Sequence, residues 1–555
     1  MTEGRVRPLR WSLDKAALAL SLVVLAGSAA YGASQQSDTP GAQGVVAGHV
    51  PDQLEQAAST PVSTGQTGDG PSHWWDPGDG RVFPQYVEYP NAVGSVGILN
   101  EGGTFNTAGH PFFEPLGENG RACVSCHQPA DGMALSLRSI KERWEETGGK
   151  DPIFAAIDGS NCPSLPQGEA SSHSLLLKRG LFRIFLPWPP KAQDGSAITP
   201  EFDIEVVRDP GTCNTDPKYG LNSENPMISV YRRPRVVANM QYVLHRNFGI
   251  GAFVGKTGEP AMRDPENGQP VNMNMMADAR HPTLKTQAVE AAITHLQFNG
   301  VLNAEQLTKI QDFENQIYSA QTRSNEGGSL VEADGPAGFG PRNLAAGQKG
   351  VLGNNTTRWV FPVGDAWQTR KTDESDAQFE MRQSILRGQQ IFHFRTFWIR
   401  DSMYLNNVGL GNPVKRTCAT CHGMHMTGMD AANGWMDLGT TNLPWAKEAP
   451  RNPWQTEDEL MPLFKVTCRK DVAPHLYLGR VIYTQDPGRA LISGKCNDVG
   501  AIVMQQFRGL AAREPYFSNG SAANIRELID FYDRRYNVQY SEQEKRDLEH
   551  FLASL

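Results

Sequence analysis

The chain has 555 residues, which is enough for two or more domains that each bury a sizeable core. Hydrophobic residues make up 39% of the sequence and charged residues 20%, as is typical of a soluble globular protein. The formal net charge is −8, so the basic footprint of a nucleic-acid-binding protein is missing and we expect no nucleic-acid partner.

The N-terminus has the pattern of an export signal. Basic residues between Arg5 and Lys15 precede an apolar run over 16–30, which ends in the small residues of a cleavage site. The run is shorter than the roughly 20 apolar residues of a membrane-spanning helix. We therefore predict export, with retention of this segment as a membrane tether left open.

Composition and periodicity predict a mainly α fold, and they divide the chain into five segments. We expect a signal peptide or N-terminal anchor over 1–33, a flexible or irregular arm over 34–85, an N-terminal domain over 86–330, a linker over 331–376 and a C-terminal domain over 377–555. Apolar spacing and capping residues predict helices over 135–146, 282–297, 304–320, 377–394 and 524–535, and a last helix that starts at Ser541. Strand-like runs are few, for example 476–483.

One five-residue motif occurs in each predicted domain. The two copies are Cys123-Val-Ser-Cys126-His127 and Cys418-Ala-Thr-Cys421-His422, each with an arginine two residues before the first cysteine. This is the attachment signature of c-type haem: the cysteines form thioethers and the histidine ligates iron. Zinc clusters or disulfide loops are the alternatives, but each motif supplies three ligands and structural zinc needs about four. We therefore predict two covalently attached haem c groups and a periplasmic location for the mature protein.

The other four cysteines fall into two pairs in loop-like sequence. Cys162 is followed by Cys213, and Cys468 by Cys496. Because an exported protein meets an oxidising environment, we predict two local disulfides, one per domain, rather than four free thiols.

The chain resembles the bacterial di-haem cytochrome c peroxidase and MauG superfamily. The resemblance rests on the paired haem motifs, on the block from Asp278 to Ala288 and on the block from Arg508 to Ser521, and it covers most of 100–555. It implies two cytochrome-c-like haem lobes with long irregular insertions. It also implies peroxide chemistry at the N-terminal haem, electron relay through the C-terminal haem, and a small redox protein (a cytochrome c or a cupredoxin) as electron donor. Calcium between the lobes is common in the family, although no acidic cluster here matches a dedicated calcium loop.

Carried over by position, the first site shows departures from the family. Gln287 matches the distal glutamine, whereas the interhaem tryptophan falls on Ala277 and the catalytic glutamate on Gln297. Glu290 and His295 lie on the same predicted helix as Gln287, and either could supply the missing proton-transfer group. The alternative is that both are ordinary surface or core side chains.

At the second site, Tyr532 aligns with the distal ligand position. Peroxidases of the family carry methionine there and MauG-type enzymes carry tyrosine. Tyr532 could instead be part of the apolar stripe of its helix, and the competing ligands are Met504, Met424, His425 and Met426.

Three functions follow from these patterns. The first is reduction of hydrogen peroxide at the N-terminal haem, with electrons relayed through the C-terminal haem. The second is MauG-like or rubber-oxygenase-like oxidation of a protein or organic substrate, with peroxide or oxygen as oxidant. The third is a di-haem electron-transfer cytochrome without enzymatic activity, because a fold by itself does not define a function.

Overall fold

A computed structural model describes residues 73–192, 195–244, 275–346, 366–402, 411–423, 428, 435–441 and 459–555. The predicted export signal, most of the predicted arm, and Met424, His425 and Met426 lie outside these ranges. In the part of the chain that is described, no helix is both long and apolar enough to cross a membrane.

The prediction of a mainly α fold is wrong. Helices take up 31% of the described residues and strands 20%. Several strands are buried on nearly every residue, as in β3 (Gly94–Asn100) and β8 (Ile317–Ser324), so they show no polar–apolar alternation to read from sequence. The predicted helix over 304–320 ends at Gln316, where α7 (Ala304–Gln316) passes directly into β8.

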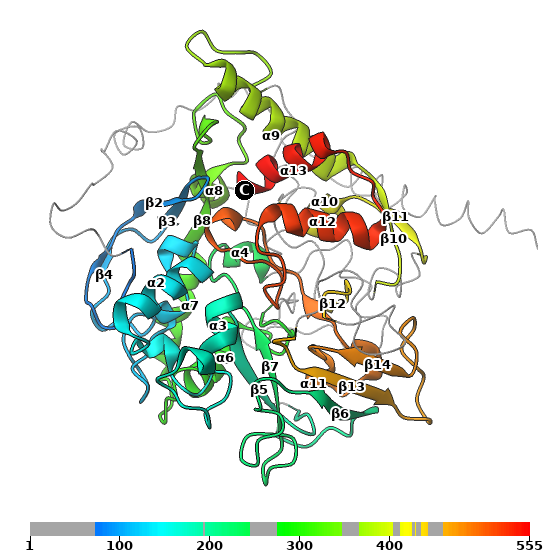
Figure 1. Cartoon of the computed structure of the whole chain (residues 1–555). Helices are drawn as coiled ribbons and strands as arrows, with labels where there is room; N and C mark the ends of the chain where they lie inside the picture. The colour runs from blue at the N-terminus through cyan, green and yellow to red at the C-terminus, as the bar shows by residue number, and fades with distance from the viewer. Residues whose placement is uncertain are drawn as a thin grey trace, which may run out of the picture. The chain divides into compact units, whose positions relative to one another are not determined.

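A four-stranded antiparallel sheet lies in the N-terminal half (Figure 1). Its order is β2 (Tyr86–Asn91), β3, β8 and β9 (Gly328–Ser329). A short pair, β1 (Val82–Phe83) and β4 (Phe105–Asn106), accompanies it. An aromatic core that includes Phe83, Phe112 and Phe313 fills the space between this pair and α7.

A second sheet combines strands that are far apart in the chain. Its order is β14 (Val481–Thr484), β13 (Leu463–Cys468) and β6 (Phe202–Arg208), all antiparallel. The antiparallel pair β5 (Phe182–Pro187) and β7 (Met227–Arg232) packs into the same apolar cluster. Residues of both predicted domains therefore share one sheet and one core. Residues 65–555 form one compact unit.

Both predicted disulfides are present. One joins Cys162 to Cys213 and the other joins Cys468 to Cys496. Cys468 ends β13, so the second disulfide ties one end of the central strand of the shared sheet to the 3-10 helix Cys496–Asp498, which follows α11 (Ala490–Ser493).

Helices dominate the C-terminal half. α9 (Asp376–Phe394) packs along α13 (Glu542–Ala553), and Gly388 allows their close approach, since a Cβ there would lie 1.9 Å from the carbonyl oxygen of Asp547. α12 (Ile525–Tyr536) buries its apolar stripe against the same core, and Ser541 caps α13 with Glu544 as the sequence indicates. The predicted helices over 377–394, 524–535 and from Ser541 are confirmed.

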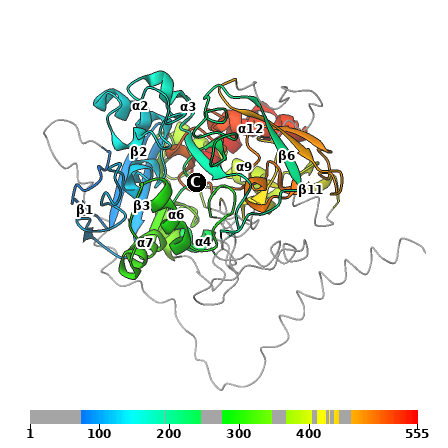
Figure 2. The same cartoon turned by 90° about the horizontal axis from the view of Figure 1, so that it is seen from below.

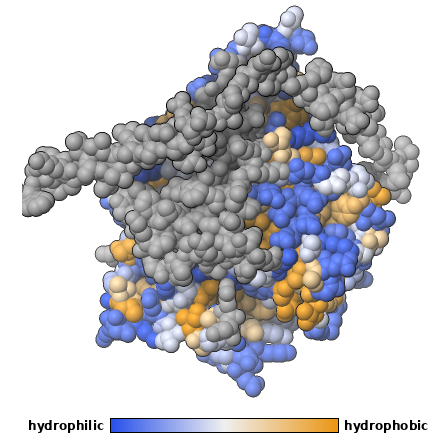
Figure 3. All heavy atoms as spheres, turned by 180° about the vertical axis from the view of Figure 1, so that it is seen from behind, coloured by the Kyte–Doolittle hydropathy of each residue, from blue (hydrophilic) through white to orange (hydrophobic). Residues whose placement is uncertain are grey.

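The remaining helices and strands are short. They are α2 (Leu137–Thr147), α3 (Ser174–Arg179), α4 (Met240–Val243), α6 (Leu284–Thr294), α8 (Gly340–Ala346), α10 (Cys418–His422), β10 (Phe397–Ile399), β11 (Val414–Arg416), β12 (Trp435–Met436) and β15 (Ile502–Val503). In the view from below, α4, α6, α7 and β3 lie on one side and α9, α12 and β6 on the other (Figure 2). From behind, hydrophilic and hydrophobic side chains are interspersed over the described surface (Figure 3).

Candidate functional site

The first motif lies on the wall of a large cavity. Cys123 opens a 3-10 helix, and Cys123 and Cys126 are free thiols. Both cysteines and His127 line a space of about 1420 Å³, counting the part that is open to solvent. We call this space the first cavity.

Burial keeps the ring of His127 in its neutral form. Desolvation lowers its pKa to about 4, an effect that the backbone carbonyls of Met133 and Arg235 partly offset. The imidazole is therefore neutral at physiological pH, which is the form that donates a ring nitrogen to iron. Its buried Nδ1 has no hydrogen-bond partner among the described residues.

One face of α6 forms a side of the first cavity. Thr283 caps the helix by accepting a hydrogen bond from the backbone N–H of Thr286 at 3.2 Å. The side chains that reach the cavity recur with helical spacing: Leu284, Gln287, Ala288, Ala291 and His295. Two of the three predicted catalytic residues, Gln287 and His295, are thus brought to the same space as His127.

Glu290 faces away from this space. Its carboxylate accepts a hydrogen bond from the Arg280 Nε at 2.7 Å and pairs with the ring of His281. Burial alone would raise its pKa, but His281 and Arg280 hold that pKa below its usual range. Glu290 is therefore a half-buried, ion-paired carboxylate that does not line the first cavity. Gln297, where the family carries its glutamate, is also not among the cavity-lining residues.

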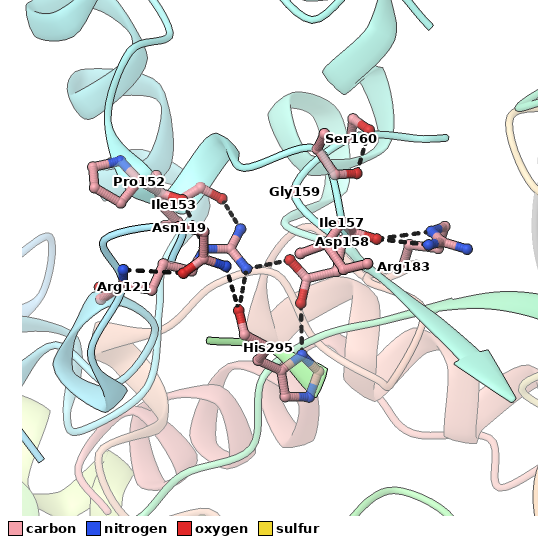
Figure 4. Close-up of polar contacts among 12 residues, drawn as sticks. Asn119, Arg121, Pro152, Ile153, Ile157, Asp158, Gly159, Ser160, Arg183 and His295 are labelled. Atoms are coloured by element: carbon pink, nitrogen blue, oxygen red, sulfur yellow. Dashed lines mark hydrogen bonds and ion pairs between the residues drawn. The ribbon is translucent and has the colours of Figure 1, made fainter. Parts of the chain in front are cut away.

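His295 belongs to a buried polar network (Figure 4). Its Nδ1 lies 2.6 Å from Oδ2 of Asp158, and the other oxygen of Asp158 pairs with the Arg121 guanidinium. Arg121 is also held by the carbonyl of Pro152 at 2.7 Å, and Asn119 donates to the carbonyl of His295 at 2.8 Å. Arg121, Asp158 and His295 all line the first cavity.

This network determines which nitrogen of His295 carries hydrogen. Burial alone would raise the pKa of Asp158, but Arg121 and His295 together hold that pKa below its usual range. Because an ionised carboxylate only accepts hydrogen bonds, the Nδ1 of His295 must be the donor. The Nε2 is left to accept or donate a proton within the cavity.

Five arginines also line the first cavity. They are Arg121, Arg232, Arg233, Arg235 and Arg280. Arg232 bonds to Asp278 at 2.6 Å and to Asp486 at 2.7 Å, and Arg280 bonds to Asp278 at 2.7 Å. Guanidinium groups at such a wall suit the propionate carboxylates of a haem.

The second motif adjoins two smaller, connected spaces of about 820 and 610 Å³, which together we call the second cavity. Cys418 and Cys421 are free thiols at α10, and desolvation lowers the pKa of His422 to about 3. The His422 ring stacks on Phe507 with 4.1 Å between centroids, and its buried Nδ1 has no hydrogen-bond partner in the described part of the chain.

Both candidates for the distal position reach the second cavity. Tyr532 and Met504 line each of its two spaces together with His422. Burial, and then the neighbouring Tyr536, raise the pKa of Tyr532 well above its usual value, so the phenol is neutral unless a cation is bound to it.

The two cavities share a wall. Arg233, Pro234, Gln505 and Gln506 line both of them. Ala277, at the position of the family's interhaem tryptophan, lines only the first cavity, and its carbonyl accepts a hydrogen bond from the Val503 N–H at 2.8 Å. The segments around Pro234 and Gln505 therefore lie between the two motifs.

The residues present fit two covalently attached haems. Each motif offers two free thiols and a neutral histidine with an unpartnered buried nitrogen, next to a cavity. Across the described ranges, no group of three or more His, Cys, Asp or Glu side chains is placed to hold a metal ion by itself. Sequence reasoning missed Asp158 and Glu314 at the first cavity. Glu314 could have been noticed as an acidic residue on the apolar face of a predicted helix, four positions after Ile310, whereas nothing local marks Asp158.

Comparison with known proteins adds little. No protein-family model matches the chain, and no curated protein matches it. Among solved structures, Kuenenia stuttgartiensis hydrazine synthase pressurised with xenon is similar over 59% of this chain and 73% of that one, at 12% identity and a TM-score of 0.28. A similarity at this level carries no conclusion about fold or function.

Proposed function

We propose that the protein is a periplasmic di-haem c oxidoreductase that reduces hydrogen peroxide in the first cavity and receives electrons from a small redox protein through the second site. The observation that carries this proposal is the difference between the two cavities. The first holds a glutamine, a histidine paired with a carboxylate, and arginines beside His127. The second has an almost wholly apolar space of about 610 Å³ around His422, which offers the phenol of Tyr532 and the thioether of Met504, while its other space shares Arg233, Gln505 and Gln506 with the first cavity.

The chain supplies the residues that would bind each haem. Cys123, Cys126 and His127 would hold one haem, and Cys418, Cys421 and His422 would hold the other, together with Tyr532 or Met504, which line the same spaces as His422. Bound haem supplies redox-active iron for electron transfer and peroxide reduction. A calcium ion between the lobes remains part of what the family resemblance implies.

Side chains of the first cavity would handle protons. His295, oriented by Asp158, can hold or move a proton at Nε2, which is the role of a general acid–base group. The Gln287 amide can donate and accept hydrogen bonds and so can orient peroxide. The distinction between the two cavities then assigns proton chemistry to one site and electron entry to the other.

The test is the visible, near-infrared and EPR spectrum of the purified ferric protein before and after one equivalent of hydrogen peroxide. We expect one five-coordinate and one six-coordinate haem, rapid spectral change with peroxide, and no peroxide reaction in His127→Ala. The exposed His73 provides the control His73→Ala. Full activity of His127→Ala would overturn the assignment of the first cavity, and two six-coordinate haems inert to peroxide would favour an electron-transfer cytochrome.

Tyr532 supports a second candidate function, oxidation of a protein or organic substrate in the manner of MauG or rubber oxygenases. The residue reaches both spaces next to His422, as expected of the tyrosine ligand of MauG-type enzymes. If Tyr532 is the ligand, Tyr532→Met changes the spectrum of the second haem while Met504→Leu leaves it unchanged. The reverse pattern would remove the support for this candidate.

A further inference from the structure

Glu314 is a buried acid that no function described so far uses. It lies near the end of α7, is only 4% exposed and lines the first cavity. Its Oε2 is buried and has no hydrogen-bond partner among the described residues. Figure 2 shows α7 beside α6, the helix that carries Gln287 and His295.

The surroundings of Glu314 favour a neutral acid. A buried carboxylate needs a cation or hydrogen-bond donors to stay ionised, and otherwise it keeps its proton. Burial raises the pKa of Glu314 to about 8. Asp158, at the same cavity, shows the opposite behaviour because Arg121 and His295 bond to it directly.

The cations at the cavity are already engaged. Arg121 pairs with Asp158, while Arg232 and Arg280 share Asp278. Arg233 and Arg235 donate to backbone carbonyls, the latter to Val503 at 3.0 Å and to Met504 at 2.7 Å. The other titratable groups facing the cavity are Cys123, Cys126, His127, Asp158 and His295.

A carboxyl group of this kind is a proton donor. Enzymes that need an acid at neutral pH keep a carboxyl protonated by enclosing it without a counter-charge. The geometry points to Glu314 as a catalytic acid of the first cavity that delivers a proton to peroxide, with His295 as the second proton-handling group. This assignment deepens the function proposed above and rests on it.

The proposed reduction of peroxide is balanced in atoms and electrons. Reduction of hydrogen peroxide consumes two electrons and two protons, breaks the O–O bond and yields two water molecules. The electrons come from the external redox protein. Glu314 releases one of the two protons through breaking of its O–H bond, and its carboxylate then takes a proton from solvent.

Three variants separate this role from a structural one. Glu314→Gln keeps the shape of the side chain but removes the acid, and Glu314→Asp keeps the acid on a shorter stem. Glu305→Gln is the matched control, because Glu305 lies on the same helix with a side chain 76% exposed. All three are compared with the wild-type di-haem protein.

The first measurement is the infrared difference spectrum between pH 7 and pH 9.5. We expect a protonated-carboxyl band in the wild type and in Glu305→Gln that is lost in Glu314→Gln. An unchanged band in Glu314→Gln would show that another carboxyl group produces it and that Glu314 loses no proton between pH 7 and pH 9.5, which would overturn the proposal, whatever the protein does with peroxide.

The second measurement is the rate of the peroxide reaction in a single turnover across pH. We expect the wild-type rate to fall as pH rises through about 8. At saturating peroxide the Glu314→Gln rate should be at least about tenfold lower, with the half-saturating peroxide concentration unchanged, and Glu314→Asp should recover part of it. Equal rates in wild type and Glu314→Gln would overturn the role of Glu314 and leave the proposed function intact. A wild type inert to peroxide would overturn both, and the infrared band would still report the protonation state separately.

Discussion

At the scale of single residues, the structure distinguishes between two candidate proton-transfer groups that the sequence could not rank. His295 and Glu290 are five positions apart, and each could serve as a proton-transfer group on the predicted helix. Tertiary contacts place them differently: His295 lines the first cavity and bonds to Asp158, while Glu290 is neutralised by Arg280 and His281 on the other side.

We therefore expect different outcomes from two substitutions by glutamine. His295→Gln removes the proton carrier and should lower the rate of the peroxide reaction by about 100-fold, with the ferric haem spectrum unchanged. Glu290→Gln should leave the rate near that of the wild type. Stopped-flow absorbance measures both, and a larger loss in Glu290→Gln than in His295→Gln would exchange the two roles.

Glu314 also has a consequence for stability that does not depend on catalysis. Its pKa is raised from 4.5 to about 8 by burial, so the folded chain keeps a proton that the unfolded chain releases above pH 4.5. The wild type must then lose stability as pH rises from 4.5 to about 8, because the unfolded state binds fewer protons over that interval.

Glu314→Gln lacks this penalty. The variant should match the wild type near pH 4.5 and become more stable than the wild type as pH rises, by up to about 5 kcal/mol above pH 8. Urea denaturation at several pH values gives the difference. A difference that stays constant with pH would contradict burial of the acid in its neutral form.

At the scale of secondary-structure elements, α6 presents two faces of different character. Small residues, Ala288 and Ala291, leave room on the side of the first cavity. On the opposite side, Ile293 is 54% exposed. Added bulk on the cavity face, with a volume-conserving change on the opposite face as control, can therefore test whether the helix borders the space used by peroxide.

Ala291→Leu adds bulk inside the first cavity and should slow the peroxide reaction at least about tenfold, since misplacement of a reactant by about 1 Å can cost 100-fold. Ile293→Leu, at an exposed position of nearly constant volume, should leave the rate unchanged. Single-turnover rates and thermal melting of both proteins make the comparison. Equal rates in the two variants would place the peroxide site elsewhere.

At the scale of the whole molecule, the two halves of the chain are joined through the shared sheet. β6 comes from the N-terminal half and pairs along its length with β13 from the C-terminal half. Arg232 adds a buried ion pair to Asp486 across the same division. Each half alone would leave part of an apolar core and unpaired strand edges exposed to water.

Expression of 86–330 and 377–555 as separate chains should therefore give no cooperatively folded N-terminal half. The isolated 86–330 segment exposes the inner side of β6, including Phe202 and Ile204, and should bind a hydrophobic dye and melt without a sharp transition. Calorimetry measures the sharpness of the transition and dye fluorescence measures the exposed apolar surface, with the full chain as control. A sharp melting transition in the isolated segment would show that its core is complete without β13.

The sequence by itself determined the features that depend on local chemistry. Haem attachment motifs are contiguous, helix stripes and caps repeat over a few residues, and the two disulfide pairs are close in the chain, so α9, α12, α13 and both disulfides could be predicted. Tyr532 and Met504 could be named as candidates for the same reason, although their common place in the second cavity required the structure.

Only the tertiary structure decided the features that depend on contacts between distant residues. The mixed fold arises because β6 meets β13 and β3 meets β8. Of these strands, β3 and β8 are buried on nearly every residue and carry no alternation that marks them. The same reason applies to the first cavity. Asp158 approaches His295 from far away in sequence, and Glu314 becomes a neutral acid only because the folded chain removes water without supplying a counter-charge.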